Sequence, residues 1–156
     1  MRIIVLLALA TIFIITSSMF LSSPTVSLVH AQSSSAIQSQ ETDFPGVVAE
    51  IIQCRRKRGI LTVQVRARNT SSKRVRVFWH DVKKDVYLMD ETNQKKYFVL
   101  KDATNDYIWS GSPGDINPDT TKISWFKFPA PPADVKEITV VLPKCAPFED
   151  VPIQDK

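Results

Sequence analysis

The chain has few of the residues from which common active sites are built. Its 156 residues include two histidines, two cysteines and four glycines. His30 lies in the N-terminal segment that we expect to be removed, and the one remaining histidine is too few for an ordinary zinc site. No Gly-x-Ser-x-Gly elbow and no glycine-rich phosphate loop occurs. We therefore predict no catalytic residue, no metal site and no cofactor.

Two arrangements of residues are still compatible with catalysis or with metal binding. His80 beside Asp81 could join a serine in a hydrolase, although a role at the end of a strand is favoured. Four aspartates between 102 and 119 could converge on a cation, although Thr120 and Phe126 stand where an EF-hand needs glycine and glutamate. Aspartates also form turns, and we favour that role. The four are Asp102, Asp106, Asp115 and Asp119.

Helical periodicity is also lacking, and alternation replaces it from Gly46 onward. Residues 61–68 alternate apolar with polar side chains, which is typical of a half-buried strand. The apolar runs 86–89 and 97–100 flank a polar loop and predict a hairpin. About seven to nine short strands without helices predict an all-β fold, a sandwich of two antiparallel sheets. The other strands are expected at 47–54, 75–79, 123–128 and 138–142, with a short edge strand at Val151 and Ile153.

The N-terminal sequence predicts export. Arg2, the apolar run after it and the small-residue site Val29-His30-Ala31 are typical of a secretory signal peptide over residues 1–31. An uncleaved membrane anchor is the alternative, because roughly 20 apolar residues span a bilayer. The Ser- and Gln-rich segment 32–43 predicts a flexible tether, and residues 44–156 suffice for one domain with one core. We expect an exported protein, secreted or held in the periplasm or cell envelope.

Cys54 and Cys145, the two cysteines, bracket most of the strand-like sequence. The chain contains no Cys-x-x-Cys motif, which disfavours a redox-active pair. In an exported protein, a disulfide between the first and last strands is the economical interpretation. This bridge would close a loop of about 90 residues and contribute ~4–5 kcal/mol to stability.

The C-terminal third contains the most distinctive stretch, Trp125-Phe126-Lys127-Phe128-Pro129-Ala130-Pro131-Pro132, followed by Pro147-Phe148-Glu149-Asp150-Val151. Together with Val86-Tyr87-Leu88-Met89-Asp90, it resembles a class of exported bacterial domains of unknown function. These domains are immunoglobulin-like β-sandwiches, similar to small secreted antigens and envelope-lipoprotein domains. The resemblance covers residues 46–153 and implies fold and location. The class has no agreed catalytic residues, and the paired cysteines and the basic hairpin depart from its pattern.

Positive charge is concentrated in one part of a chain whose formal net charge is +4. Between Arg55 and Arg76 no acidic residue occurs, and arginine predominates over lysine. If the strands at 61–68 and 75–79 are neighbours, their alternate arginines share one outward face, bordered by the turn 55–59. Such a face attracts polyanions and suits bidentate contact with phosphate, sulfate or carboxylate. The candidate anion-binding residues are Arg55, Arg56, Lys57, Arg58, Arg66, Arg68, Lys73, Arg74 and Arg76.

A basic face can also serve only to solubilise a sheet and to prevent edge pairing. We favour a noncatalytic binding module whose partner is an anionic envelope polymer, anionic lipid headgroups or an acidic protein surface. The alternatives are a purely structural accessory domain of the cell envelope and a hydrolase with an unrecognised site. The expected location outside the cytoplasm disfavours nucleic acid as a partner. The protein is anchored to the membrane only if the signal stays uncleaved. The oligomeric state is left open.

Overall fold

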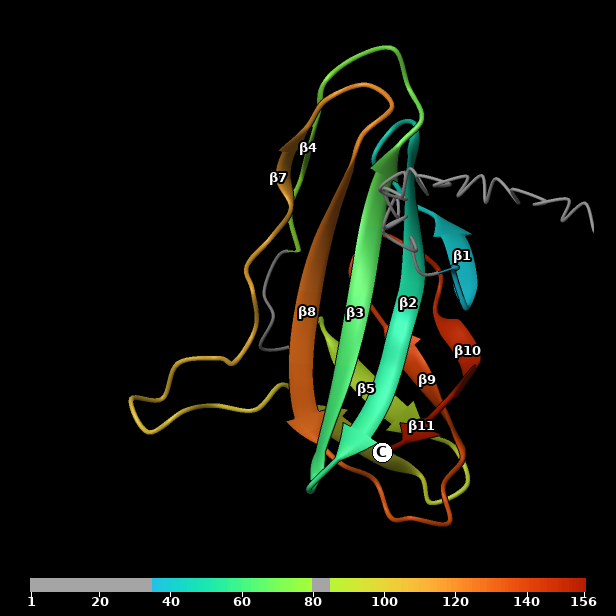
Figure 1. Ribbon diagram of the computed structural model, residues 1–156, viewed down its shortest axis with the longest axis vertical. Coiled ribbons are helices and arrows are strands. Elements are labelled where there is room, and N and C mark those ends of the chain that lie inside the picture. Colours follow the sequence, from blue (N-terminus) through green and yellow to red (C-terminus); the bar gives the residue numbers. More distant parts are fainter. Residues whose placement is uncertain (1–34, 80–84) are drawn as a thin grey trace, which may run out of the picture. The chain divides into compact units, whose positions relative to one another are not determined.

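The computed structural model describes residues 35–79 and 85–156, and every regular element in them is a β-strand (Figure 1). This confirms the predicted all-β class, but the described residues form eleven strands where the sequence predicts seven to nine. Several are too short to produce a visible alternation. The strands are β1 (Gln38–Glu41), β2 (Val47–Lys57), β3 (Ile60–Asn69), β4 (Val75–Val77), β5 (Tyr87–Asp90), β6 (Lys95–Phe98), β7 (Gly114–Ile116), β8 (Thr121–Pro129), β9 (Glu137–Val141), β10 (Phe148–Pro152) and β11 (Gln154–Asp155).

These strands form three sheets. The largest has the order β1-β2-β3-β8, and β11 also pairs with β2. The second has the order β10-β9-β5-β6, and β4 and β7 form the third. All pairs are antiparallel except β11 with β2. The predicted hairpin is confirmed as β5–β6, and the predicted edge strand is β10, where a proline is tolerated.

The two larger sheets bury one shared apolar core. Figure 1 shows β5 and β9 crossing behind β2 and β3. Val63 and Phe126 face the core from the first sheet, and Leu88, Val140 and Phe148 from the second, all fully buried. Each such side chain contributes about 1.5–3 kcal/mol relative to remaining in water. The core therefore holds the five-stranded sheet against the second one and leaves its outer face open.

A β-bulge at Ile52 shifts the alternation of β2 by one residue. Before the bulge, Ile51 pairs with an inward-facing residue of β3. After the bulge, Cys54 and Arg56 pair with inward-facing residues and are buried. Arg55 and its alternate neighbours on this part of β2 consequently face outward. Sequence alternation alone does not reveal this change of face.

Cys54 and Cys145 do not form the predicted disulfide; both are free thiols. Cys145 lies between β9 and β10 and pairs with Thr42. The Thr42 N–H donates to the Val47 carbonyl at 3.2 Å, which places Cys145 near the start of β2. The extended chain from Val47 to Cys54 spans roughly 20 Å, whereas a disulfide needs Cα atoms about 4.4–6.8 Å apart. The bridge and its contribution to stability are therefore excluded.

Burial raises the pKa of the Cys54 thiol to about 12 and that of the Cys145 thiol to about 11. Thiols with such pKa values carry almost no thiolate at neutral pH and are poor nucleophiles. The last strand, β11, does run parallel beside β2. The end of the described chain thus adjoins the first long strand through main-chain hydrogen bonds rather than through a covalent link.

Part of the segment predicted to be a flexible tether instead forms β1 and pairs with β2. Two of its glutamine side chains also donate to carbonyl groups within 147–149. These hydrogen bonds, together with the packing of Ile37 against the core, thus order a segment that has no apolar periodicity. The predicted signal peptide, residues 1–31, lies outside the described residues. The described residues belong to one compact unit, Ser33–Lys156, and contain no helix with the length and apolarity to cross a membrane.

Candidate functional site

The fold divides the predicted basic cluster into separate groups. β4 pairs with β7 rather than with β3, so the condition for one continuous arginine face is not met. The buried Asn69, at the end of β3, redirects the chain. Its side-chain N–H groups donate to the Lys73 carbonyl at 2.7 Å and to the Ile116 carbonyl at 3.0 Å. Residues after Asn69 therefore join another sheet.

Arg66 and Arg68 share one buried carboxylate. Arg66 Nε lies 2.5 Å from one Glu50 oxygen, and Arg68 Nε lies 3.0 Å from the other. Glu50 is 5% exposed and stands on the neighbouring strand β2, directly opposite Arg66. The acid-free segment of the sequence thus acquires its counter-charge from outside, through the β2–β3 register.

Arg74 and Arg76 likewise share Asp115 of β7. Arg76 Nε lies 3.1 Å from Asp115 Oδ1, and Arg74 donates to Oδ2. The hydrogen bond from Arg74, followed by that from Arg76, lowers the pKa of Asp115. These ion pairs are exposed and add little stability. Lys73 is exposed beside them, away from the groove described below.

Arg56 faces the interior, and all its nitrogen atoms are engaged. Two of its nitrogens donate to the Asp155 carboxylate at 2.6 and 3.1 Å. The third nitrogen, Nη1, donates to the main-chain carbonyls of Pro131 and Pro132 in the Pro-rich crossover between β8 and β9, and Nη2 donates to that of Ala133 as well as to Asp155. The hydrogen bond to Asp155 is the main reason that the pKa of Arg56 is raised. Arg56 is therefore a structural clamp that joins β2, the crossover and β11.

The remaining predicted residues, Arg55, Lys57 and Arg58, stay together at one end of the five-stranded sheet. They border a shallow groove of about 470 Å³ on its outer face, which we call the basic groove. Lys127 of β8 adds a fourth cation. Among the described residues, no carboxylate pairs with any of these four. The groove is lined by Arg55, Lys57, Arg58, Ile60, Thr62, Gln64, Trp125 and Lys127.

Strand register determines the layout of the basic groove. Arg55, Thr62 and Lys127 form one row across β2, β3 and β8. Gln64 and Trp125 stand opposite each other in the next row. Because adjacent strands lie about 4.8 Å apart, the backbones of Arg55 and Lys127 are about 10 Å apart. Cations thus line both sides of a floor of uncharged polar side chains.

The turn at the end of the groove holds Arg58 in an uncommon conformation. The sequence predicts a turn over 55–59, but β2 continues to Lys57 and only Arg58–Gly59 forms the turn. Both residues have positive φ, 50° and 76°, as in the two-residue turns that favour Asn-Gly. A non-glycine residue held there costs about 1 kcal/mol or more. The turn nevertheless places a guanidinium at the rim of the groove.

Trp125 provides a half-buried aromatic surface inside the groove. Lys127 Nζ lies 5.5 Å from the centre of its ring, within cation–π distance. The Thr62 hydroxyl and the Gln64 amide make no hydrogen bond to other described residues. The groove therefore combines four cations, one ring and uncommitted donors and acceptors.

Sequence reasoning missed Lys127, Trp125, Thr62 and Gln64. All four stand on the outward face by simple alternation, against buried residues such as Phe126. That signal was present in the sequence. The pairing of β3 with β8, which brings them beside Arg55, joins segments more than 50 residues apart and left no local signal.

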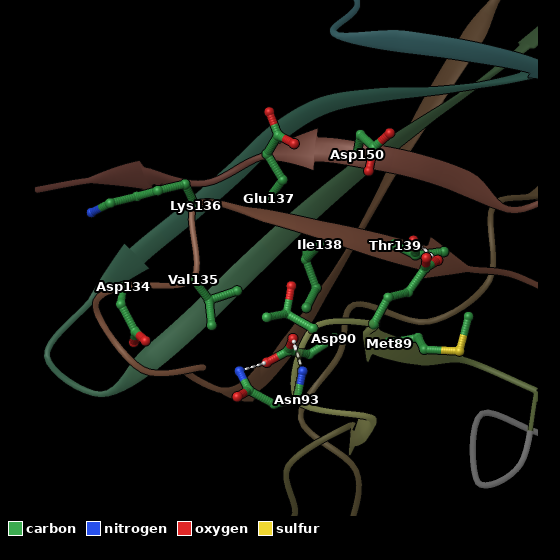
Figure 2. A pocket seen from close by; sticks show the side chains of 12 residues that line it. Met89, Asp90, Asn93, Asp134, Val135, Lys136, Glu137, Ile138, Thr139 and Asp150 are labelled. Carbon is green, nitrogen blue, oxygen red and sulfur yellow. Dashed lines mark hydrogen bonds between the residues drawn. The ribbon is translucent and has the colours of Figure 1, made fainter.

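A second hollow, of about 250 Å³, lies between the β5–β6 turn and β9 and has an acidic lining (Figure 2). The buried Asp90 accepts hydrogen bonds from the Asn93 main-chain N–H at 3.0 Å and from its side chain at 2.8 Å. Glu91 accepts one from Thr139 at 3.1 Å. Figure 2 shows Lys136 extending away from Asp90. Two of these carboxylates are thus engaged in structural hydrogen bonds.

Three of the four aspartates considered as cation ligands accept hydrogen bonds from side chains: Asp102, Asp106 and Asp115. Asp102 accepts hydrogen bonds from Thr104 and from the Asp106 main chain, and the Thr104 hydroxyl chiefly lowers the pKa of Asp102. The described residues contain no group of three or more His, Cys, Asp or Glu side chains that could hold a metal ion. His80 and Asp81 lie outside the described residues.

Comparison of the chain with family models, curated proteins and solved structures finds no match. The resemblance to exported immunoglobulin-like domains therefore stays an expectation. Interpretation of the site depends on its geometry and charge.

Proposed function

We propose that the protein is an exported, noncatalytic binding module of the immunoglobulin-like class, and that its basic groove engages an anionic partner outside the cytoplasm. One observation carries the proposal. Arg55, Lys57, Arg58 and Lys127 converge on one groove without a carboxylate partner among the described residues. The fold supplies an acid to the predicted arginines elsewhere on the chain.

Uncompensated charge at this spacing is tolerable in the free protein. Two unit charges about 10 Å apart in water repel by about 0.4 kcal/mol. The same charges raise the local potential and attract an anion, most strongly at low salt. Groups that only solubilise a sheet do not need to surround an aromatic ring and free hydrogen-bonding groups. The arrangement therefore favours binding over a purely structural role.

The groove favours binding over catalysis as well. Its lining contains no carboxylate, histidine or thiol. Thr62 supplies a hydroxyl, but no general base lines the groove beside it. An anion held there would be oriented by guanidinium and ammonium groups without a group to attack it.

The test compares two double variants with the same change of net charge. Arg55→Glu plus Lys127→Glu reverses the two sides of the groove. Lys73→Glu plus Lys122→Glu reverses two exposed lysines outside it. On a sulfate-bearing resin, we expect the groove variant to elute at much lower salt than the wild type. The matched control should elute close to the wild type.

Thermal unfolding of both variants checks that each is folded. Equal elution of the two variants would show that only net charge matters and would contradict the proposal. A purely structural domain predicts that equal result.

A further inference from the structure

The floor of the basic groove has no free main-chain edge. β3 is hydrogen-bonded to β2 on one side and to β8 on the other. The outer edge of β8 is also used, because the Lys127 N–H donates to Ile108 O at 3.1 Å and the Ser110 N–H donates to Trp125 O at 3.0 Å. A peptide therefore cannot add here as an extra strand. A ligand in the groove meets side chains alone.

Those side chains offer a particular combination of chemistry. The half-buried Trp125 ring can pack against the C–H faces of a sugar ring. Thr62 and Gln64 can exchange hydrogen bonds with hydroxyl groups, and they make none with the described protein. The four cations can bind carboxylate, sulfate or phosphate. Apolar ring face, hydroxyl and anion are the three features of an acidic sugar.

Other anionic partners fit less well. The exposed large apolar residues of the described chain, Phe98 and Ile123, lie outside the groove lining, although protein interfaces depend on apolar and aromatic anchors. The hairpin tip, Arg58–Gly59, carries no apolar side chain to insert into a lipid surface. Charge and a single half-buried aromatic ring would remain to hold an acidic protein, and charge alone would hold a membrane.

The spacing of the cations favours a chain over a single small anion. Arg55 and Lys57 lie about 7 Å apart along β2, and Lys127 lies about 10 Å across the sheet from Arg55. One carboxylate or phosphate cannot reach all of them. Anionic groups that recur along a polymer can contact several at once, which increases affinity by multivalency.

We propose that the basic groove binds an acidic glycan, a chain of pyranose rings that bear anionic groups, with a ring packed on Trp125. This inference rests on the proposed function and names its ligand class. The binding free energy then has a charge part, from the four cations, and a ring part, from Trp125, Thr62 and Gln64.

The purified full chain is titrated with four probes that separate the two parts. Polygalacturonate carries a carboxylate on each pyranose ring, polyglutamate carries the same charge without rings, dextran has rings without charge, and phosphatidylglycerol vesicles test a membrane. We expect polygalacturonate to bind about tenfold more tightly than polyglutamate at equal carboxylate concentration, which corresponds to about 1.4 kcal/mol. Dextran and the vesicles should bind more weakly than polygalacturonate.

Substitution of the ring tests its role directly. Trp125→Ala should reduce polygalacturonate binding to the polyglutamate level and leave polyglutamate binding unchanged. Trp125→Phe, which keeps a ring, should retain most of the difference. Phe98→Ala removes an exposed ring outside the groove and should change neither affinity.

The outcomes distinguish this inference from the function on which it rests. Equal affinity for the two polyanions, an equal loss of both in Trp125→Ala, or tighter binding to vesicles would overturn the glycan inference and leave an anion-binding groove. Failure to bind any of the charged probes, or binding of dextran as tightly as polygalacturonate, would overturn both.

Discussion

Replacement of Arg56 by methionine tests the clamp at the end of the five-stranded sheet. Methionine keeps an aliphatic chain at the buried position but removes the guanidinium. The wild-type side chain donates five hydrogen bonds, two to Asp155 and one each to the carbonyls of Pro131, Pro132 and Ala133. We expect the free energy of unfolding to fall by about 3 kcal/mol.

The magnitude follows from what the substitution leaves behind. The carbonyl of the buried Pro131 loses its guanidinium donor, which costs about 1–3 kcal/mol. Pro132 and Ala133 are exposed, so water replaces the donor there and each loss is about 0.5–1 kcal/mol. Asp155 returns to water, since its side chain is already 54% exposed. For a domain of this size, 3 kcal/mol corresponds to roughly 10 °C in Tm.

Urea unfolding at pH 7, followed by circular dichroism, measures this change. Arg55→Met is the matched control, because Arg55 is the preceding residue, faces outward and donates no hydrogen bond to the described residues. It should alter stability by less than about 0.5 kcal/mol. If the Arg56 and Arg55 variants unfold at the same urea concentration, the clamp is not the source of stability that its geometry indicates.

The pH dependence of the clamp has a definite sign. The hydrogen bond from Arg56 lowers the pKa of Asp155. The stabilisation from this carboxylate is complete above its unfolded pKa, about 3.9, and is lost as the pH falls through the lower folded value. Acidification should therefore narrow the difference in stability between the wild type and the Arg56→Met variant.

Two substitutions and the reactivity of the two thiols test other features. Arg58→Asn should raise stability by about 0.5–1 kcal/mol in urea unfolding, because asparagine accepts the positive φ of the turn at lower cost, and a loss would contradict that reading of the turn. Glu50→Gln should lower stability by about 2–3 kcal/mol in the same assay, because two arginines lose their buried counter-charge, and an unchanged midpoint would show that this ion pair is dispensable. Iodoacetamide at pH 8 should modify Cys54 and Cys145 slowly in the native protein but both readily in urea without reductant, as mass spectrometry can show. Protection in urea would indicate a disulfide after all. Since the thiols' pKa values rise from 9.0 to about 12 and about 11 on folding, the stabilisation that they provide should be complete below pH 9 and lost as the pH rises to the folded values.

Local sequence patterns sufficed to predict several elements. Residues 61–68 became the central part of β3, and the runs at 86–89 and 97–100 became the β5–β6 hairpin. The first prediction depends on side chains that alternate between core and solvent, and the second on two apolar runs that flank a polar loop. Both patterns lie within one short segment. Such a prediction does not require knowledge of which distant segments pair with the strand.

Pairing between distant strands was not predictable in this way. The alternation of Val75 and Val77 continues that of β3, yet the buried Asn69 redirects the chain and β4 pairs with β7. The disulfide prediction failed for a similar reason. Cysteine number and an export signal favoured a bridge, but the register beside Thr42 keeps Cys145 far from Cys54.

The candidate site was likewise predictable where it depends on local sequence and unpredictable where it depends on pairing between distant strands. Charge along the sequence identified Arg55, Lys57 and Arg58, which remain in the basic groove. It also included Arg66, whose counter-charge, Glu50, lies outside the acid-free segment. Lys127 lies in the groove only because β8 pairs with β3, and these two strands are far apart in the sequence. Charge density in a sequence therefore locates cations but does not tell which of them the fold neutralises.

The bulge at Ile52 changes which alternate positions of β2 face the core. Odd-numbered positions of β2 contact the core before it, and even-numbered positions do so after it. Without that extra residue, the guanidinium of Arg56 would point to solvent, and the side chain of Arg55 would enter the interior. One apolar residue, itself outside the groove, thus places Arg56 in the interior and leaves Arg55 on the outer face of the sheet.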